Sequence, residues 1–203
     1  YEEYLYACRD GVPYRKRLFE MCVEKDDATS QKAEIEERVR RLRSNKDLYQ
    51  SFPRVLAVDT WLLVFNEDRL RYPLLILRGP SLSGKTEFAK SLFKQPLELK
   101  LGLLDHFPDG MRRFDRKIND GIVLDDLRDF QFLLNHQEKL QGKYDALVEF
   151  ASTPGGQCAY SKDLYKVPVV VTANLDTRNE DLLVSSDWLS KDANRVLVRW
   201  PPV

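Results

Sequence analysis

The stretch that decides the fold is Leu74-Leu-Ile-Leu-Arg-Gly-Pro-Ser-Leu-Ser-Gly-Lys-Thr86, within a chain of 203 residues. Its continuous apolar run, residues 74–77, predicts a strand that is buried on both faces. The residues that follow fit the phosphate-loop pattern G-x-x-x-x-G-K-[ST] without a departure, and the helix-forming run 87–93 comes directly after them. A chance turn is the alternative. The strand before and the helix after favour an α/β nucleotide-binding fold with a central parallel sheet.

The phosphate loop predicts a set of ligands for ATP and Mg²⁺. Glycines let the backbone bend so that successive N–H groups point at a phosphate. Lys85 is expected to reach the β- and γ-phosphates, and the Thr86 hydroxyl to bind Mg²⁺. The predicted nucleotide-binding residues are Gly79, Pro80, Ser81, Leu82, Ser83, Gly84, Lys85 and Thr86.

Two carboxylates follow a second apolar strand, predicted over residues 121–125. Functional side chains of a parallel sheet gather at the carboxyl ends of its strands, where Asp125 and Asp126 fall. We assign Asp125 to the metal and Asp126 to orienting and deprotonating the attacking water. A solvated Asp-Asp turn is the alternative, which the phosphate loop upstream makes less attractive.

A third strand, residues 167–173, is β-branched and runs into Asn174. An amide at that strand end, beside the Asp pair, can hydrogen-bond the γ-phosphate or the attacking water. The alternative is that Asn174 only makes a turn, which Asn does readily.

These three elements together resemble the superfamily 3 helicases, AAA+-like P-loop ATPases of small DNA viruses, over residues 73–200. Motif A matches 79–86, motif B 122–126 and motif C 169–174. The likeness is greatest to Rep-type replication proteins of circular single-stranded DNA (circovirus-like) viruses or an endogenous relative. It implies an ATP-dependent DNA helicase that translocates on single-stranded DNA as a homo-oligomeric, hexameric ring. The sequence departs from the family in ending motif C with Thr-Ala-Asn, and the family's rolling-circle nuclease signatures are missing.

The resemblance also implies two sets of residues outside the phosphate site. An arginine finger, which acts on the neighbouring subunit's nucleotide, is assigned to Arg195, with Arg178 and Arg199 as competitors. The family's DNA-contacting hairpin falls on residues 152–166, where Lys162 and Lys166 are the predicted nucleic-acid contacts. A surface hairpin without a ligand is the alternative.

The remaining segments organise the chain. We expect an N-terminal helical or oligomerisation segment, 1–72, and an ATPase domain, 73–203. A helix over 31–43 packs either on neighbouring subunits or on its own domain, and a helix within 54–65 packs beneath the first strand. A weak strand is expected at 97–101, an irregular polar segment at 103–120, a helix around 127–140 and a last strand at 195–200. The first residue is not Met, so we expect a fragment.

Composition limits the function further. Lys plus Arg equals Asp plus Glu, 32 each, so the net charge is zero. This does not support a uniformly basic surface that binds nucleic acid non-specifically, but it is compatible with a ring whose pore is locally basic.

The cysteines indicate the compartment. Cys8, Cys22 and Cys158 are odd in number and widely spaced, which indicates reduced thiols in an intracellular protein. We expect a nuclear location. The basic run Arg15–Arg17 is either the remnant of a nuclear-import signal or a solvated charge run. No apolar run is long enough for a membrane span. The alternatives to a helicase are a decayed, nucleotide-binding interaction module and a generic ring ATPase.

Overall fold

The computed structural model describes residues 52–101, 106–151 and 159–202, together with 30, 31, 33–35, 37, 38, 40 and 41. The chain divides into two units, Tyr1–Phe52 and Pro53–Val203. In the first unit, the described residues between 30 and 41 are helical, as predicted, and Glu37 pairs there with Arg40. The three cysteines and the basic run 15–17 lie outside the described residues.

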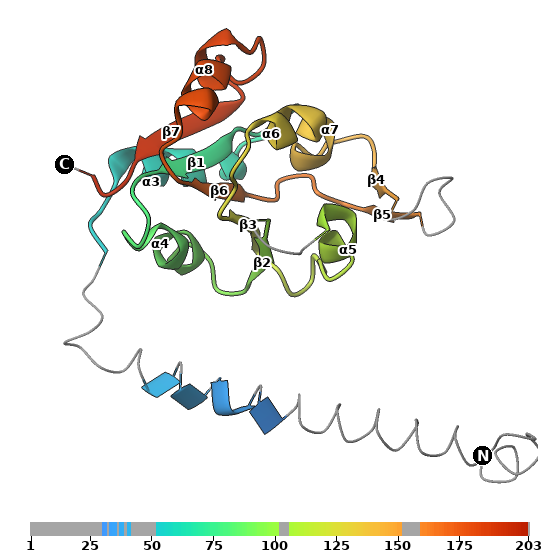
Figure 1. Ribbon diagram of the computed structural model, residues 1–203. Helices are drawn as coiled ribbons and strands as arrows, with labels where there is room; N and C mark the ends of the chain where they lie inside the picture. Colours follow the sequence, from blue (N-terminus) through green and yellow to red (C-terminus); the bar gives the residue numbers. More distant parts are fainter. Residues whose placement is uncertain are drawn as a thin grey trace, which may run out of the picture. The chain divides into compact units, whose positions relative to one another are not determined.

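A five-stranded parallel sheet forms the centre of the second unit, which confirms the α/β prediction (Figure 1). Its strand order is β2-β3-β6-β1-β7, so β6 separates β1 from β3. The strands are β1 (Leu74–Arg78), β2 (Pro96–Lys100), β3 (Gly121–Asp125), β6 (Val169–Ala173) and β7 (Arg195–Arg199). Because all pairs are parallel, the carboxyl ends of β1, β3 and β6 meet along one edge.

Alternation along the strands divides the core into two layers. Side chains of a strand point to opposite faces in turn, so a strand with apolar residues throughout is buried on both sides. In β1, Leu74 and Ile76 belong to one apolar cluster, while Leu75 and Leu77 belong to the other. The strands β3 and β6 alternate in the same way, which explains why their sequences are continuous apolar runs.

Helices cover both faces of the sheet. Helices α3 (Leu56–Leu63) and α4 (Lys85–Ser91) contribute to the cluster on one face, and a short 3₁₀ helix, η1 (Val64–Asn66), follows α3. The other face is covered by α5 (Phe107–Met111), α6 (Gln131–Asn135), α7 (Gln137–Leu140) and α8 (Thr177–Ser185). None of the described helices is long and apolar enough to cross a membrane.

The second unit begins before the boundary expected at residue 73. Trp61 of α3 is only 1% exposed and packs in the same cluster as the β1 leucines. Its indole Nε1 donates to the Pro73 carbonyl at 2.7 Å. Helix α3 is therefore part of the sheet's own core, beneath the first strand as predicted.

Two predicted segments differ from the structure. The stretch expected to be irregular contains α5, whose Phe107 and Met111 lie one turn apart and are both buried in the core. The helix expected around 127–140 is instead the short pair α6 and α7. Before α6, the backbone N–H groups of Leu127 and Phe130 donate to the Thr172 carbonyl and the Asn179 side chain, which ties the turn after β3 to β6 and α8.

A pair of antiparallel strands partly overlaps the segment 152–166, on which a DNA-contacting hairpin was expected. Strand β4 (Val148–Phe150) pairs antiparallel with β5 (Tyr160–Lys162), and the connecting residues 152–158 lie outside the described part. Phe150 stacks on Tyr160 with ring centres 5.3 Å apart. The hairpin is thereby anchored to the core cluster that contains Val148 and Phe150.

Candidate functional site

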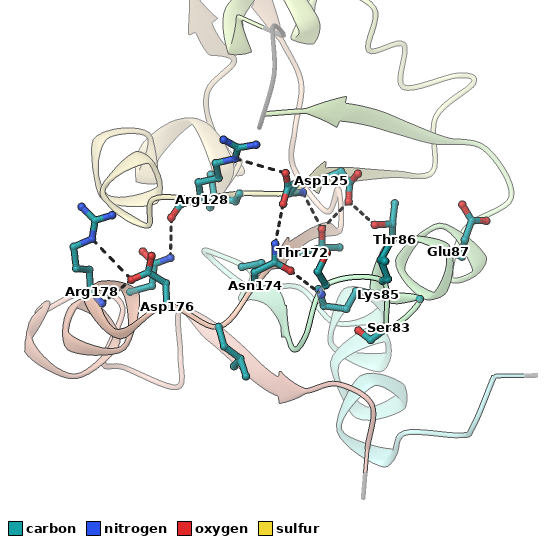
Figure 2. Close-up of a pocket in the computed structure, with 18 residues that line it drawn as sticks. Ser83, Lys85, Thr86, Glu87, Asp125, Arg128, Thr172, Asn174, Asp176 and Arg178 are labelled. Atoms are coloured by element: carbon teal, nitrogen blue, oxygen red, sulfur yellow. Dashed lines mark hydrogen bonds and ion pairs between the residues drawn. The ribbon is translucent and has the colours of Figure 1, made fainter.

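The predicted site residues gather around one pocket of about 910 Å³ at the carboxyl ends of β1, β3 and β6 (Figure 2). Its lining consists of residues 81–87, 125–128, 172–176, 178 and 179. The sequence-predicted Lys85, Thr86, Asp125, Asp126 and Asn174 are all in this set. Gly79 and Pro80 do not line the pocket, but their carbonyls bond Lys85.

The phosphate loop bends through left-handed backbone positions. Gly84, immediately before α4, has φ 84°, where a glycine pays no steric cost. Leu82 has φ 59° and is fully exposed, a strained conformation for a branched side chain. Ser83 Oγ donates to the Pro80 carbonyl at 2.8 Å and closes the turn.

Lys85 points into the site rather than into solvent. Its Nζ donates to the Gly79 carbonyl at 3.0 Å, to the Pro80 carbonyl and to Asn174 Oδ1 at 3.1 Å. The residue is 7% exposed, and this burial lowers the pKa of the ammonium, against the opposing effect of Asp126 and Asp125. A buried cation with three oxygen partners is well placed to exchange some of them for phosphate oxygens.

Thr86 and Asp125 form a pair of hard oxygen donors. Thr86 Oγ1 donates to Asp125 Oδ1 at 2.6 Å, and Thr172 Oγ1 donates to the same oxygen at 2.7 Å. A hydroxyl and a carboxylate are the donors that Mg²⁺ prefers, with its remaining positions left to water and phosphate. In the described parts of the chain no three His, Cys, Asp or Glu side chains cluster as a metal cage. The donor set therefore fits a nucleotide-bound Mg²⁺.

Asn174 lies between the lysine and the second aspartate. It accepts from Lys85, and its Nδ2 donates to Asp126 Oδ1 at 3.2 Å (Figure 2). This geometry follows from the strand order, because β6 lies between β1 and β3. Asn174 thus does more than make a turn.

Asp126 is held in a left-handed conformation, φ 54°, that Asp tolerates better than most residues. Its backbone N–H donates to Thr172 Oγ1 at 3.0 Å, which fixes the turn after β3. Arg128 lies 3.7 Å from its carboxylate, with a side chain 70% exposed. The two aspartates therefore differ: Asp125 accepts two hydroxyls, and Asp126 faces an amide and a cation.

Among the pocket residues that had no role assigned from the sequence, Thr172, Arg128 and Asn179 make contacts that shape the site. Thr172 lies two positions before Asn174, on the same side of the strand, and this alternation was the available signal. Asn179 is 3% exposed and joins α8 to the turn after β3. Its side chain accepts from the Phe130 N–H and donates to the Arg128 carbonyl, each at 2.9 Å. No local pattern in the sequence marks that contact.

Arg195, the predicted arginine finger, does not join the pocket. It starts β7, opposite Leu74, at the amino end of the sheet, whereas the phosphate loop is at the carboxyl end. Its guanidinium donates to the Leu189 carbonyl and lies 3.8 Å from Asp192, and its side chain is 14% exposed. Arg178, its competitor, lines the pocket with a side chain 89% exposed. A finger that acts on a neighbouring subunit's nucleotide need not line the pocket of its own chain, so the assignment of Arg195 stays a prediction.

The two predicted DNA contacts are engaged within the chain. Lys162 lies opposite Val148, at the base of the hairpin rather than near its connecting residues, and donates to the Phe114 and Arg112 carbonyls at 2.6 and 3.1 Å. Lys166 pairs with Asp68 at 2.7 Å. Neither ammonium extends from the hairpin as a simple surface charge.

Comparison with known proteins gives little further information. No protein-family model matches the chain, and no curated protein matches it. A structure of NtrX from Brucella abortus in complex with ATP aligns with 14% identity and a TM-score of 0.44, covering 91% of this chain and 44% of that one. A second NtrX structure, with ADP, aligns at 13% identity and a TM-score of 0.37. This chain spans less than half of NtrX, and a likeness this weak says nothing of function.

Proposed function

We propose that this chain binds ATP with Mg²⁺ and hydrolyses its terminal phosphate bond. The observation that carries the proposal is the chain of contacts from Lys85 through Asn174 to Asp126, beside the pair of Thr86 and Asp125. A phosphate-binding cation, an amide, a carboxylate and a metal-type donor pair are thereby brought together from the start of α4 and the carboxyl ends of β3 and β6. This is the combination that phosphoryl transfer to water requires.

Each side chain has a distinct role in this proposal. Lys85 exchanges carbonyl partners for β- and γ-phosphate oxygens. Thr86 and Asp125 hold Mg²⁺, which neutralises charge that develops on the phosphates when it is bound. Asp126 orients the attacking water and takes its proton, while Asn174 fixes the carboxylate and contacts the γ-phosphate.

Calorimetric titration of the full chain with ATP and Mg²⁺ tests the proposal. Lys85→Ala should abolish measurable binding or turnover, because the buried ammonium committed to the phosphates is lost. Lys90→Ala is the matched control: it removes a lysine of the same helix that does not itself line the pocket and that pairs with Glu87 at 2.6 Å and Glu98 at 3.5 Å. Equal ATP binding by wild type and Lys85→Ala would contradict the proposal.

The finer proposal is a helicase domain of Rep type, which acts on single-stranded DNA as a homo-oligomeric ring. The order of the three motifs supports it, as does a hairpin between motifs B and C. A hollow of about 520 Å³ beside the hairpin supports it further, since its lining is rich in cations. These cations are Arg112, Arg113, Arg116 and Lys162, with Asp115 and Asp163 among them.

A salt series of DNA binding tests this partner. Affinity for single-stranded DNA should fall with salt, with a slope of roughly −0.7 per phosphate contact. Lys162→Ala should lower the affinity and flatten the slope, because Lys162 lines the hollow. Lys166→Ala should do less, because Lys166 lies outside that hollow and pairs with Asp68. If the wild type forms rings with ATP but binds no DNA, the helicase proposal yields to a nucleotide-binding interaction module.

A further inference from the structure

We infer that Trp200, directly after β7, is a positioning residue that holds the phosphate loop in the shape that receives the nucleotide. This inference rests on the proposed ATP binding. Trp200 is 3% exposed and is not part of the pocket lining, so it acts through the loop and not on the ligand. It contacts the chain before, within and after the loop.

The first contact is at the start of the loop. The Trp200 backbone N–H donates to the Arg78 carbonyl at 2.6 Å, which extends the β1–β7 pairing by one residue. The Trp200 carbonyl then lies so close to Gly79 that an added Cβ would come within 1.9 Å of its oxygen. Gly79 is therefore required by the packing of Trp200 as well as by the phosphate-loop pattern.

The second contact is in the middle of the loop. The indole Nε1 donates to the Ser83 carbonyl at 2.7 Å. In a planar trans peptide the carbonyl and the next N–H point in opposite directions. Fixing the Ser83 carbonyl toward Trp200 therefore turns the Gly84 N–H away from it, in a loop whose N–H groups must be free to bind phosphate. One hydrogen bond from the core thus sets the orientation of a phosphate-binding amide.

The third contact is with the helix that follows. The Trp200 ring stacks on Phe88 of α4, with centroids 4.1 Å apart and planes 20° from parallel. Phe88 is 5% exposed, so the stacked pair is fixed in the core. Trp200 consequently holds Arg78, Ser83 and Phe88, and with them the whole path from strand to helix.

Trp61 provides a matched control. It lies in the same apolar cluster, is 1% exposed and also donates from Nε1 to a backbone carbonyl at 2.7 Å. Its acceptor, Pro73, precedes β1, at the end of that strand opposite the phosphate loop. Trp61→Phe and Trp200→Phe therefore remove the same kind of hydrogen bond from the same core, at opposite ends of one strand.

The test is calorimetric titration of the wild-type chain and both variants with ATP and Mg²⁺, alongside thermal unfolding. Both variants should unfold at a lower temperature than the wild type. Trp200→Phe alone should raise the Kd for ATP, by about three- to tenfold, the size expected for one lost neutral hydrogen bond. Its kcat at saturating ATP should stay near the wild-type value, since no reacting group is removed. Equal Kd values for Trp200→Phe and wild type, or an equal rise in Trp61→Phe, would overturn the inference.

A second measurement keeps the inference testable if Trp200→Phe does not fold. The chain has three tryptophans, so 5-fluorotryptophan labelling gives three ¹⁹F resonances, which Trp61→Phe and Trp188→Phe assign by elimination. The Trp200 resonance should shift on saturation with ATP, and the Trp61 resonance should not. An unmoved Trp200 resonance in a chain that binds ATP would contradict the inference alone. A wild type that takes up no ATP would contradict the proposed function itself.

Discussion

Asn174 donates from its side-chain amide to Asp126 Oδ1 at 3.2 Å, and so connects the strand ends of β6 and β3. The same amide accepts from Lys85 at 3.1 Å, so the phosphate-binding lysine and the proposed base share one intermediary. If Lys85 moves toward the γ-phosphate, its hydrogen bond to Asn174 is lost, and Asn174 can then change its position relative to Asp126. Because β6 is inserted between the other two strands, no direct contact between Lys85 and Asp126 is needed for this coupling.

The proposed base gives the first prediction. Asp126→Asn should leave ATP binding near wild type and lower turnover by about 10²–10⁴-fold, because the amide still accepts from Asn174 but cannot take a proton. Asp129→Asn makes the same change three residues later, where the side chain only accepts from the Gln131 N–H, and should be nearly silent. Phosphate release per bound ATP measures both. Wild-type turnover in Asp126→Asn would remove Asp126 from the mechanism.

The close approach of Gly79 to the Trp200 backbone gives the second prediction. Gly79→Ala should cost about 1–3 kcal/mol or more in unfolding free energy, because its Cβ would meet the Trp200 backbone, which cannot move without shifting β7. Gly121→Ala is the comparison: its Cβ would meet the Phe93 ring, which can rotate away, so the cost should be smaller. Urea unfolding measures both. Equal costs would show that the loop and β7 move apart easily.

The arginines give the third. Arg178→Ala should lower ATP turnover at least about tenfold with little change in stability, because its exposed cation lines the pocket. Arg195→Ala should instead lower the melting temperature, because its guanidinium holds the Leu189 carbonyl. The measurements are turnover and thermal unfolding. Recovery of ATP hydrolysis on mixing Arg195→Ala subunits with Lys85→Ala subunits would identify Arg195 as a finger that acts on the neighbouring subunit.

A half-buried histidine, His136, gives the fourth prediction. Burial lowers the pKa of His136 below its ordinary 6.5, and Lys139 and His106 act in the same direction. Its ring packs against Phe132 and Phe107 at 4.6 and 5.1 Å. Because the folded-state pKa is the lower one, stability is full above pH 6.5 and falls as the pH drops through that value toward the folded pKa.

The stability of His136→Gln should consequently depend less on pH than that of the wild type between pH 7.5 and 5.5. Urea unfolding at both pH values measures this, with His106→Gln as a control for the other, exposed histidine. A wild-type pH dependence that persists unchanged in His136→Gln would show that another group is responsible.

The sequence by itself predicted the elements whose causes are local. Strand β3 has the expected bounds, 121–125, and β1 extends the predicted apolar run 74–77 by one residue, Arg78. The phosphate loop and the two aspartates could be found because a strand, a tight turn and a polar strand end are each encoded within a few residues. The sheet brought these predicted residues to one edge, as the rule for parallel strands requires.

Other features depended on partners far away in the chain. The segment 103–120 read as irregular because its polar residues conceal Phe107 and Met111, which are core residues only once β2 and β3 are beside them. Lys162 is a predicted nucleic-acid contact, and nothing near it in the sequence indicated that its ammonium donates to the Arg112 and Phe114 carbonyls, about fifty positions earlier. Arg195 is the predicted finger, and no local pattern indicated that its guanidinium also donates to the Leu189 carbonyl.

The contact made by Trp200 is the clearest example of a feature that the sequence alone does not predict. Its indole bonds Ser83 across 117 positions of sequence, and no local pattern around either residue indicates the contact. Periodicity and motif spacing predict local structure and candidate site residues within a segment, because they reflect backbone geometry over a few residues. A buried N–H group that lacks a hydrogen-bond acceptor destabilises the folded state, so such groups are almost always paired. Which carbonyl accepts from the Trp200 indole is determined only by the tertiary packing of the strands.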